Sequence, residues 1–268
     1  MCIRDRITAA TTNSLAAYYT RAHIRYRAGQ AIVCRFTTLF EATGKDGVLE
    51  MVGLSAFEDA WGIGYLDNDF GIIHGRSSGA QVSITSITRT STTATVTTTT
   101  AHGFTTGDMI SVRNTAQDEY IKCQRVTVTS PTTFTYIVDA TAVTPATAYI
   151  GKLMYCTKVL INCYPLTNAI DKLDGTGNSG MTLDRTKGNV WELHIPYLGY
   201  GDIAAFVLYN GKFYLFDIVN YTNLNITPSI SNPSLSLTIY CENTTNNTSR
   251  SIKCASLFAG LTGTETVD

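Results

Sequence analysis

Residues 203–219 read Ile-Ala-Ala-Phe-Val-Leu-Tyr-Asn-Gly-Lys-Phe-Tyr-Leu-Phe-Asp-Ile-Val, and this stretch decides the fold class. Asn210-Gly211 separates two apolar runs. Asn-Gly tolerates the positive φ angles that both central residues of a two-residue type I′ turn require. Such a short loop also fixes the register of the two strands, so that Tyr209 faces Lys212. The stretch therefore predicts a β-hairpin.

Both faces of this hairpin are apolar, and the predicted register extends to Ala205 opposite Phe216. One face carries Phe206, Leu208, Phe213 and Leu215, and the other carries Ala205, Val207, Tyr214 and Phe216. Because a strand with one solvated face alternates between apolar and polar residues, we expect the hairpin to lie at the centre of a sheet. We expect the first face to fill a sandwich core and the second to be covered by a neighbouring subunit, with the inserted module as the alternative cover.

The composition limits the classes of function. The 268 residues carry a net charge of −1, and only 15% of them are charged. A nucleic-acid-binding protein usually shows a basic excess, so the charge argues against nucleic acid as a partner. No segment approaches the roughly 20 apolar residues that span a bilayer, and no signal peptide is visible, so no membrane is expected.

The domain organisation is predicted from two changes in composition, at Gln81 and Gly151. Residues 1–80 and 151–268 are predicted to form one discontinuous, jelly-roll-like β-sandwich, with residues 1–6 expected to be non-native. Residues 81–150 are rich in Thr and predict an inserted small β-barrel or sandwich, because β-branched residues suit strands. Its five expected strands are Val82–Ile87, Ala94–Thr98, Met109–Arg113, Arg125–Thr129 and Phe134–Val138. The fold class is therefore all-β.

No metal or cofactor is expected. The seven cysteines form no C-x-x-C pair and predict free thiols, with a Cys241–Cys254 disulfide as the alternative. The acidic turns could supply oxygens to Ca²⁺, but they lack the regular alternation of a calcium loop, so solvated turns are favoured. These turns contain Asp67, Asn68, Asp69, Asp171, Asp174 and Asp184.

An enzyme is not predicted. The sequence contains no Gly-x-Ser-x-Gly elbow and no phosphate-binding loop. His102 precedes a glycine in a turn and is interpreted as structural. Glu192 and His194 lie two residues apart on one strand and could meet on one face, where an exposed polar pair is favoured over catalysis.

Aromatic residues supply the candidate interface or glycan-stacking sites. The chain has 15 tyrosines, several of them in and around the hairpin. Exposed tyrosines fill subunit interfaces or stack on sugars, because they offer a large area with few rotamers to freeze. The candidates are Tyr197, Tyr200, Tyr214 and Phe216.

Two resemblances point to a viral source. Residues 101–112, Ala-His-Gly-Phe-Thr-Thr-Gly-Asp-Met-Ile-Ser-Val, with Thr-Phe-Thr-Tyr at 133–136, resemble a small all-β module of tailed-phage tail and virion proteins. The flanking halves resemble a set of viral structural proteins, and their strand layout is similar to the concanavalin/laminin-G type of jelly roll. The stretches that carry this second resemblance are residues 26–30, 35–37, 64–65, 70–72, 173–177, 197–201 and 231–235.

These resemblances imply a non-enzymatic virion structural protein of a bacteriophage or similar virus. It would be made in the host cytoplasm, built into the virion, and partnered with copies of itself or with other virion proteins. The alternative is a lectin-like module of a tail fibre or receptor-binding protein that binds a host-surface glycan. A polysaccharide-degrading enzyme is a third and less favoured class, because nothing in the sequence points to a pair of catalytic carboxylates.

Overall fold

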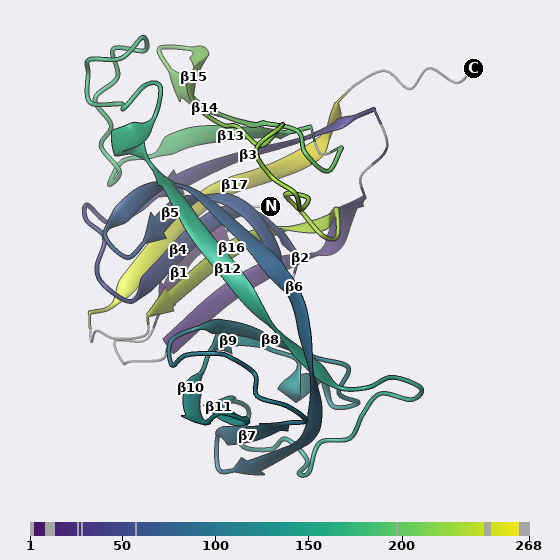
Figure 1. Cartoon of the computed structure of the whole chain (residues 1–268). Helices are drawn as coiled ribbons and strands as arrows, with labels where there is room; N and C mark the ends of the chain where they lie inside the picture. Colours follow the sequence, from purple (N-terminus) through teal and green to yellow (C-terminus); the bar gives the residue numbers. More distant parts are fainter. Residues whose placement is uncertain are drawn as a thin grey trace. The chain divides into compact units, whose positions relative to one another are not determined.

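The structure is a computed structural model that describes residues 3–8, 14–25, 27, 29–56, 58–196, 198–243 and 248–262. For residues 3–8 and 14 it describes the backbone alone. Over these ranges the chain forms 17 strands and two short 3-10 turns, at Asp118–Tyr120 and Leu166–Asn168, with no α-helix (Figure 1). The prediction of an all-β chain is confirmed.

The contacts divide the chain into two units. Unit 1 comprises Met1–His74 and Asn162–Asp268, and unit 2 comprises Gly75–Ile161. Two long strands, β6 (Asp69–Thr90) and β12 (Tyr155–Pro165), run through the points of division and pair with each other. The predicted strand at Val82–Ile87 is therefore part of a longer one. Whether unit 2 folds by itself stays a prediction.

The first sheet belongs to unit 1 and contains the hairpin. It has six strands in the order β1-β17-β3-β13-β14-β15, and neighbouring strands are antiparallel. The strands are β1 (Ile3–Thr8), β3 (Ala31–Leu39), β13 (Asn189–Ile195), β14 (Ile203–Tyr209), β15 (Lys212–Val219) and β17 (Arg250–Thr262).

The second sheet follows the path β10-β11-β7-β6-β5-β4-β16-β2, with β12, β8 and β9 paired off this path. Its unit 1 strands, besides β6 and β12, are β2 (Ser14–Arg25), β4 (Val48–Ala56), β5 (Asp59–Leu66) and β16 (Ser234–Asn243). Its unit 2 strands are β7 (Thr93–Thr98), β8 (Met109–Arg113), β9 (Cys123–Arg125), β10 (Thr127–Ser130) and β11 (Thr133–Ile137).

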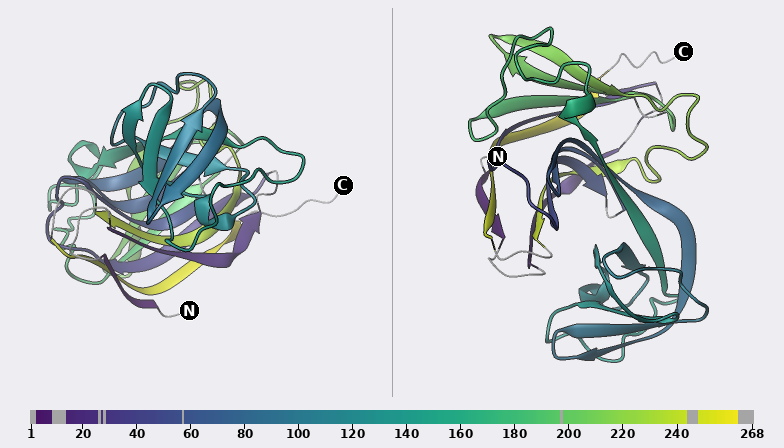
Figure 2. Two further views of the ribbon diagram at one scale, coloured as in Figure 1. Left: turned by 90° about the horizontal axis from the view of Figure 1, so that it is seen from below. Right: turned by 60° about the vertical axis from the view of Figure 1, so that its left-hand side comes forward.

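The core of unit 1 lies between the two sheets, as in a sandwich. Two tryptophans are fully buried there, Trp191 from the first sheet and Trp61 from the second. Figure 2 shows the two layers of strands from two further directions. The other fully buried aromatic and aliphatic residues of this core include Ile32, Phe36, Leu54, Ile63, Tyr65, Ile72, Leu193, Val207, Phe216 and Ile239.

Unit 2 has a separate and smaller core. It is built around Phe134, Tyr136 and Tyr120, each buried. The Tyr136 hydroxyl donates to the Tyr120 carbonyl at 2.8 Å, and the Tyr120 hydroxyl donates to the Val143 carbonyl at 2.8 Å. Both phenols are thus hydrogen-bonded, as burial requires.

The predicted hairpin forms with the predicted turn. Asn210 and Gly211 have φ angles of +49° and +79°, as a type I′ turn requires. Four predicted pairs are confirmed, from Tyr209–Lys212 to Phe206–Leu215. The fifth is wrong, because a β-bulge shifts the register and places Ala205 opposite Asp217 instead of Phe216.

The predicted position of the hairpin and the assignment of its faces are also wrong. β15 is the last strand of its sheet, so the hairpin lies at the edge and not at the centre. The face that carries Ala205, Val207 and Phe216 is the one buried in the core, each residue being 0% exposed. The other face, with Phe206, Leu208, Phe213 and Leu215, is half-buried on the outside of the sheet.

The reason for the reversal lies in the neighbouring strand. Trp191 on β13 is directly paired with Val207. Its ring packs edge-on against the Phe216 ring, with the ring centres 5.6 Å apart. The bulk of this indole fills the space on the core side, so small residues suffice at Ala205 and Val207. The larger side chains are left on the outer face.

Candidate interaction surface

The predicted contact residues differ in how far their side chains are exposed to solvent. Tyr200 is 39% exposed, whereas Phe216 is fully buried and Tyr214 is half-buried against the core. Phe216 therefore offers no surface to a partner or a sugar, which corrects its assignment as a contact residue. Tyr197 lies outside the described residues.

Tyr200 belongs to a pair of loops at the ends of β14, β13 and β15. The first loop covers residues 198–202 and the second covers residues 220–229, and together we call them the loop platform. The Tyr200 hydroxyl donates to the Ile226 carbonyl at 3.0 Å, and the Ser229 N–H donates to the Gly199 carbonyl at 2.8 Å. These bonds hold the two loops against each other.

Asp202 strengthens the same junction. Its Oδ1 accepts the N–H groups of Tyr221 at 2.6 Å and Thr222 at 2.9 Å. These two donors hold the pKa of the Asp202 carboxyl below its ordinary value. The Thr222 hydroxyl donates to the Tyr200 carbonyl at 2.9 Å, which closes the network.

The platform presents large apolar side chains to solvent. Ile226 is 96% exposed, and Leu198 and Leu224 are each 70% exposed. Asp202 is the only charged residue in the two loops. Exposed apolar groups on a well-braced support are typical of contact surfaces, because little conformational entropy remains to be lost on binding.

The backbone of the first loop is held in an uncommon conformation. Leu198 has a φ of +33°, which a non-glycine residue seldom adopts, and Gly199 follows at +79°. A Cβ on Gly201 would lie 1.8 Å from the Pro196 carbonyl oxygen, so this position accepts only glycine without rearrangement. The unusual geometry is thus fixed by the surrounding chain, as it often is at functional loops.

A second polar and aromatic group lies on the outer face of the first sheet. The prediction that Glu192 and His194 meet is confirmed, with His194 Nε2 at 2.7 Å from Glu192 Oε1. Arg35 donates through Nε, at 2.6 Å, and through Nη2 to the other oxygen of Glu192. Glu192 is only 6% exposed, so the prediction of an exposed pair is wrong for the carboxylate.

Rings complete this outer face. The Arg35 guanidinium lies 4.6 Å from the centre of the Phe213 ring, and His194 packs on Phe206 with ring centres 4.7 Å apart. Arg35 and His194 thus cover Phe213 and Phe206, two of the four residues on the outer face of the hairpin. This explains why Phe206 and Phe213 are half-buried rather than exposed.

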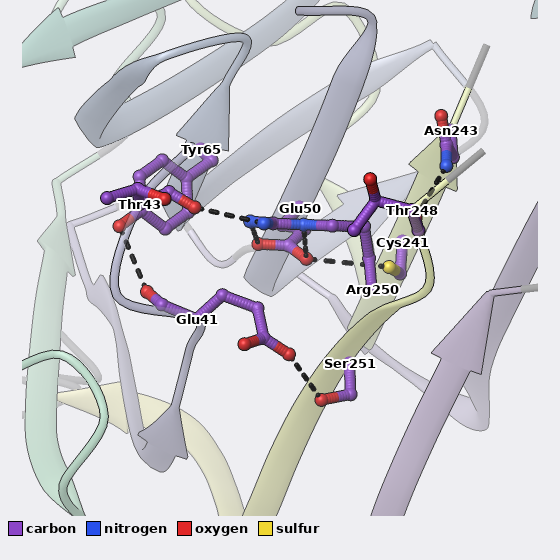
Figure 3. Close-up of polar contacts among 9 residues, drawn as sticks. All are labelled: Glu41, Thr43, Glu50, Tyr65, Cys241, Asn243, Thr248, Arg250 and Ser251. Carbon is purple, nitrogen blue, oxygen red and sulfur yellow. Dashed lines mark hydrogen bonds and ion pairs between the residues drawn. The ribbon is translucent and has the colours of Figure 1, made fainter. Parts of the chain in front are cut away.

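The most deeply buried charges lie elsewhere in unit 1 (Figure 3). Arg250 binds Glu50 through two parallel hydrogen bonds of 3.0 Å, and its Nη1 donates to the Thr43 carbonyl at 2.9 Å. Glu50 is 0% exposed and Arg250 is 3% exposed. Burial raises the pKa of the Glu50 carboxyl, and Arg250 opposes that shift.

The surroundings of this ion pair indicate a structural role. The Arg250 guanidinium lies 5.7 Å from the Tyr65 ring, and the Tyr65 hydroxyl donates to the Glu41 carbonyl at 3.0 Å (Figure 3). Arg250 begins β17 in the first sheet, and Glu50 lies in β4 of the second, so the pair ties the two layers together. No solvent-borne substrate can reach a carboxylate that is fully enclosed.

Three of the acidic turn residues are hydrogen-bonded within their own loops. Asp174 accepts both the N–H and the hydroxyl of Thr176, and Asp184 accepts the same two groups from Thr186. Asp171 accepts the N–H groups of two loop residues, Leu173 and Ser179. Within the part of the chain that the structure describes, no group of three His, Cys, Asp or Glu side chains could hold a metal ion.

Burial makes several of the described thiols unreactive. Burial raises the pKa of Cys156 and of Cys163 to about 12, and that of Cys254 to about 11. A thiol with so high a pKa is a poor nucleophile at neutral pH. The Cys241 thiol donates to Glu50 Oε1 at 3.8 Å and the Cys254 thiol donates to the Ser256 carbonyl at 3.5 Å, so the alternative of a disulfide between them is wrong. Cys34 and Cys156 are buried, and Cys123 and Cys163 are half-buried.

The sequence analysis missed three of the four large apolar residues that the platform exposes. Leu198, Leu224 and Ile226 are isolated apolar residues among Gly, Asn and Thr, and such residues form no periodic pattern. Glu50 was missed as well, although a carboxylate inside the apolar run Val48–Leu54 is a signal that a buried partner must exist. Only Tyr200 was singled out in advance.

No protein-family model matches this chain, and neither a curated protein nor a solved structure shows significant similarity to it. Among the described residues, no helix is long and apolar enough to cross a bilayer. The surface chemistry of the chain is therefore what supports a functional proposal.

Proposed function

We propose that this chain is a non-enzymatic structural protein of a virus particle and that it works through contacts with neighbouring protein subunits. The observation that carries the proposal is the loop platform, where Leu198, Leu224 and Ile226 are 70–96% exposed on two hydrogen-bonded loops. The viral part of the proposal is supported by the sequence resemblances alone.

The charge distribution also favours a protein partner of neutral character. The platform holds one carboxylate, whose oxygen is already bound by two backbone N–H groups, and no basic residue. A partner with an apolar surface would bury these side chains, and each Leu or Ile that is fully buried would contribute about 1.5–3 kcal/mol.

The direct test is an inventory by mass spectrometry of particles purified by density gradient from the virus that encodes the chain. We expect its peptides in a fixed ratio to the other particle proteins. Their absence from intact, infectious particles would overturn the proposal.

A variant separates the platform from the rest of the molecule. Ile226→Asp should reduce incorporation into particles, because a charge would be buried in the contact. Leu15→Asp is the matched control, since Leu15 on β2 is 48% exposed and receives the same change of charge outside the platform. Equal incorporation of both variants would remove the platform from the contact.

A glycan array tests the alternative role. A lectin-like module would need an exposed aromatic side chain, and of the predicted contact residues that the structure describes, Tyr200, Tyr214 and Phe216, only Tyr200 is more than one-third exposed. Glycan binding that is lost in Tyr200→Ala would replace the proposed role with that of a receptor-binding protein.

A further inference from the structure

Unit 2 carries an exposed turn just before β12, at residues 149–153, which we call the apolar turn. The Lys152 N–H donates to the Tyr149 carbonyl at 2.9 Å, and Gly151 has a φ of +75°, as the third residue of a type II turn requires. Ile150 lies at the corner of this turn and is 93% exposed. Leu153 is 77% exposed and Tyr149 is 57% exposed, so three large side chains of one short segment lie in water.

One residue, Asn114, holds both ends of the apolar turn. Its carbonyl accepts the Tyr149 N–H at 2.8 Å, and its Nδ2 donates to the Leu153 carbonyl at 2.9 Å. Thr115, the next residue, forms a β-bridge with Ala148. The exposed side chains are thus presented on a braced backbone, and little conformational entropy remains to be lost when they bind.

The charge around the apolar turn is positive. Lys152 lies within the turn and is exposed, and Arg113 directly precedes the residue that holds the turn. Residues 140–161 contain the turn and residues 109–117 include the backbone to which it is bonded, and neither range has an Asp or Glu. An apolar surface with a basic rim fits a partner that is apolar inside and negative at its surface.

The carboxylates that come next along the chain lie away from the turn. Asp118 and Glu119 follow Gln117, whose side chain exchanges two hydrogen bonds of 2.9 Å with Thr147. Thr147 precedes the β-bridge at Ala148, so the two carboxylates lie beyond that bridge from the turn. The loop platform of unit 1 has the opposite character, with one carboxylate and no basic residue, and the two apolar surfaces therefore suit different partners.

We propose that the apolar turn inserts into the headgroup layer of a membrane that contains anionic phospholipids. Ile150 and Leu153 then lie among the upper parts of the acyl chains, which removes their apolar surface from water. The Tyr149 ring has an apolar body and a polar hydroxyl, and such side chains favour the boundary between hydrocarbon and water. The Lys152 ammonium binds the lipid phosphates.

The partner is a bilayer because the turn is a protruding corner with a basic side chain, and a fluid surface accepts such a corner without a complementary pocket. The expectation of no membrane rested on the lack of a spanning segment, which this mode of binding does not need, because the protein stays at the surface. A single turn of this size binds weakly, whereas a particle that displays many copies binds tightly. That gain from many copies rests on the proposed structural role.

Co-sedimentation of the purified full chain with sucrose-loaded vesicles, at lipid concentrations up to the millimolar range, tests the inference. We expect tighter binding to vesicles of equal parts phosphatidylcholine and phosphatidylglycerol than to vesicles of phosphatidylcholine alone, and a smaller difference in high salt. Ile150→Asp should weaken binding to the mixed vesicles about tenfold or more, because a charge replaces an inserted apolar side chain. Lys152→Glu should weaken binding to the mixed vesicles and leave binding to the neutral ones unchanged.

Ile226→Asp is the matched control, because Ile226 is 96% exposed, receives the same substitution and belongs to the loop platform. It should bind vesicles as the wild type does. A wild type that binds neither kind of vesicle, unchanged binding of Ile150→Asp, or an equal loss in Ile226→Asp would overturn the membrane contact. If the wild type binds no vesicles and Ile150→Asp lowers incorporation into particles, the turn is a subunit contact instead. The proposed function is tested separately by the particle inventory, which a chain that binds no lipid can still pass.

Discussion

The two faces of the β14–β15 hairpin are equally apolar in sequence and differ in burial. Val207 and Phe216 on one face are fully buried, while Phe206 and Phe213 on the other face are half-buried under His194 and Arg35. The difference shows that hydrophobicity alone does not choose the core face of a strand. The face that is buried depends on the space that neighbouring strands leave beside it. Here the Trp191 side chain fills most of that space on the core side.

The largest effect is expected on the core face. Phe216→Ala should lower the free energy of unfolding by about 3–5 kcal/mol, because it leaves a cavity beside Trp191. Chemical denaturation measures the change. A loss near 1 kcal/mol would mean that Phe216 is not a core residue and that the burial of the two faces is not as described.

The second-largest effect on stability is expected at the turn that sets the register of the hairpin. Gly211→Val places a β-branched residue at a φ of +79°, and the strain should cost about 1–3 kcal/mol. Thermal unfolding of this variant, with Gly188→Val as a control at a glycine of ordinary φ and open surroundings, measures the cost. Equal melting temperatures would contradict the type I′ turn.

Asp171 is next to β15, where its N–H donates to the Phe216 carbonyl at 2.8 Å, and its carboxyl makes this part of the hairpin sensitive to acid. Burial would raise the pKa of this carboxyl, but the N–H groups of Ser179 and Leu173 outweigh burial and hold the pKa below 3.8. A carboxyl with a lowered pKa stabilises the fold above its unfolded-state pKa, and the effect is lost as the pH falls through the folded-state value.

Asp171→Asn should therefore destabilise the chain by about 1–3 kcal/mol at pH 7, since two hydrogen bonds to a charged acceptor are weakened. The loss relative to wild type should shrink as the pH falls below 4. Urea titrations at pH 7 and pH 3 compare the two proteins, and a difference that grows in acid would show that the sign is wrong.

The smallest effect on stability is expected on the outer face. Leu208→Ala should cost about 1 kcal/mol or less, because the side chain is already half solvated and leaves no closed cavity. The same denaturation experiment applies. A cost that equals that of Phe216→Ala would remove the distinction between the two faces.

The hairpin and the register of the four pairs nearest its turn could be predicted, because Asn210-Gly211 is a local signal that needs no tertiary information. The core face could not, because it depends on Trp191, which lies on another strand. The strand β2 could not be predicted either. It is the last strand of the second sheet and pairs with β16 on one side, and an edge strand needs no strict alternation of apolar and polar residues. The loop platform depends on bonds between residues more than 20 positions apart, such as Tyr200 and Ile226.

The edge position of β15 is the central claim about the hairpin, because it determines which backbone groups of this strand are bonded. Hydrogen exchange of the wild-type β15 amides, followed by NMR at low protein concentration, tests this position most directly. Tyr214 bonds to β14, while Phe213 and Leu215 direct their N–H groups to the edge of the sheet, so we predict slow exchange for the Tyr214 amide and fast exchange for the other two. Equally slow exchange of all three amides would contradict the edge position of β15.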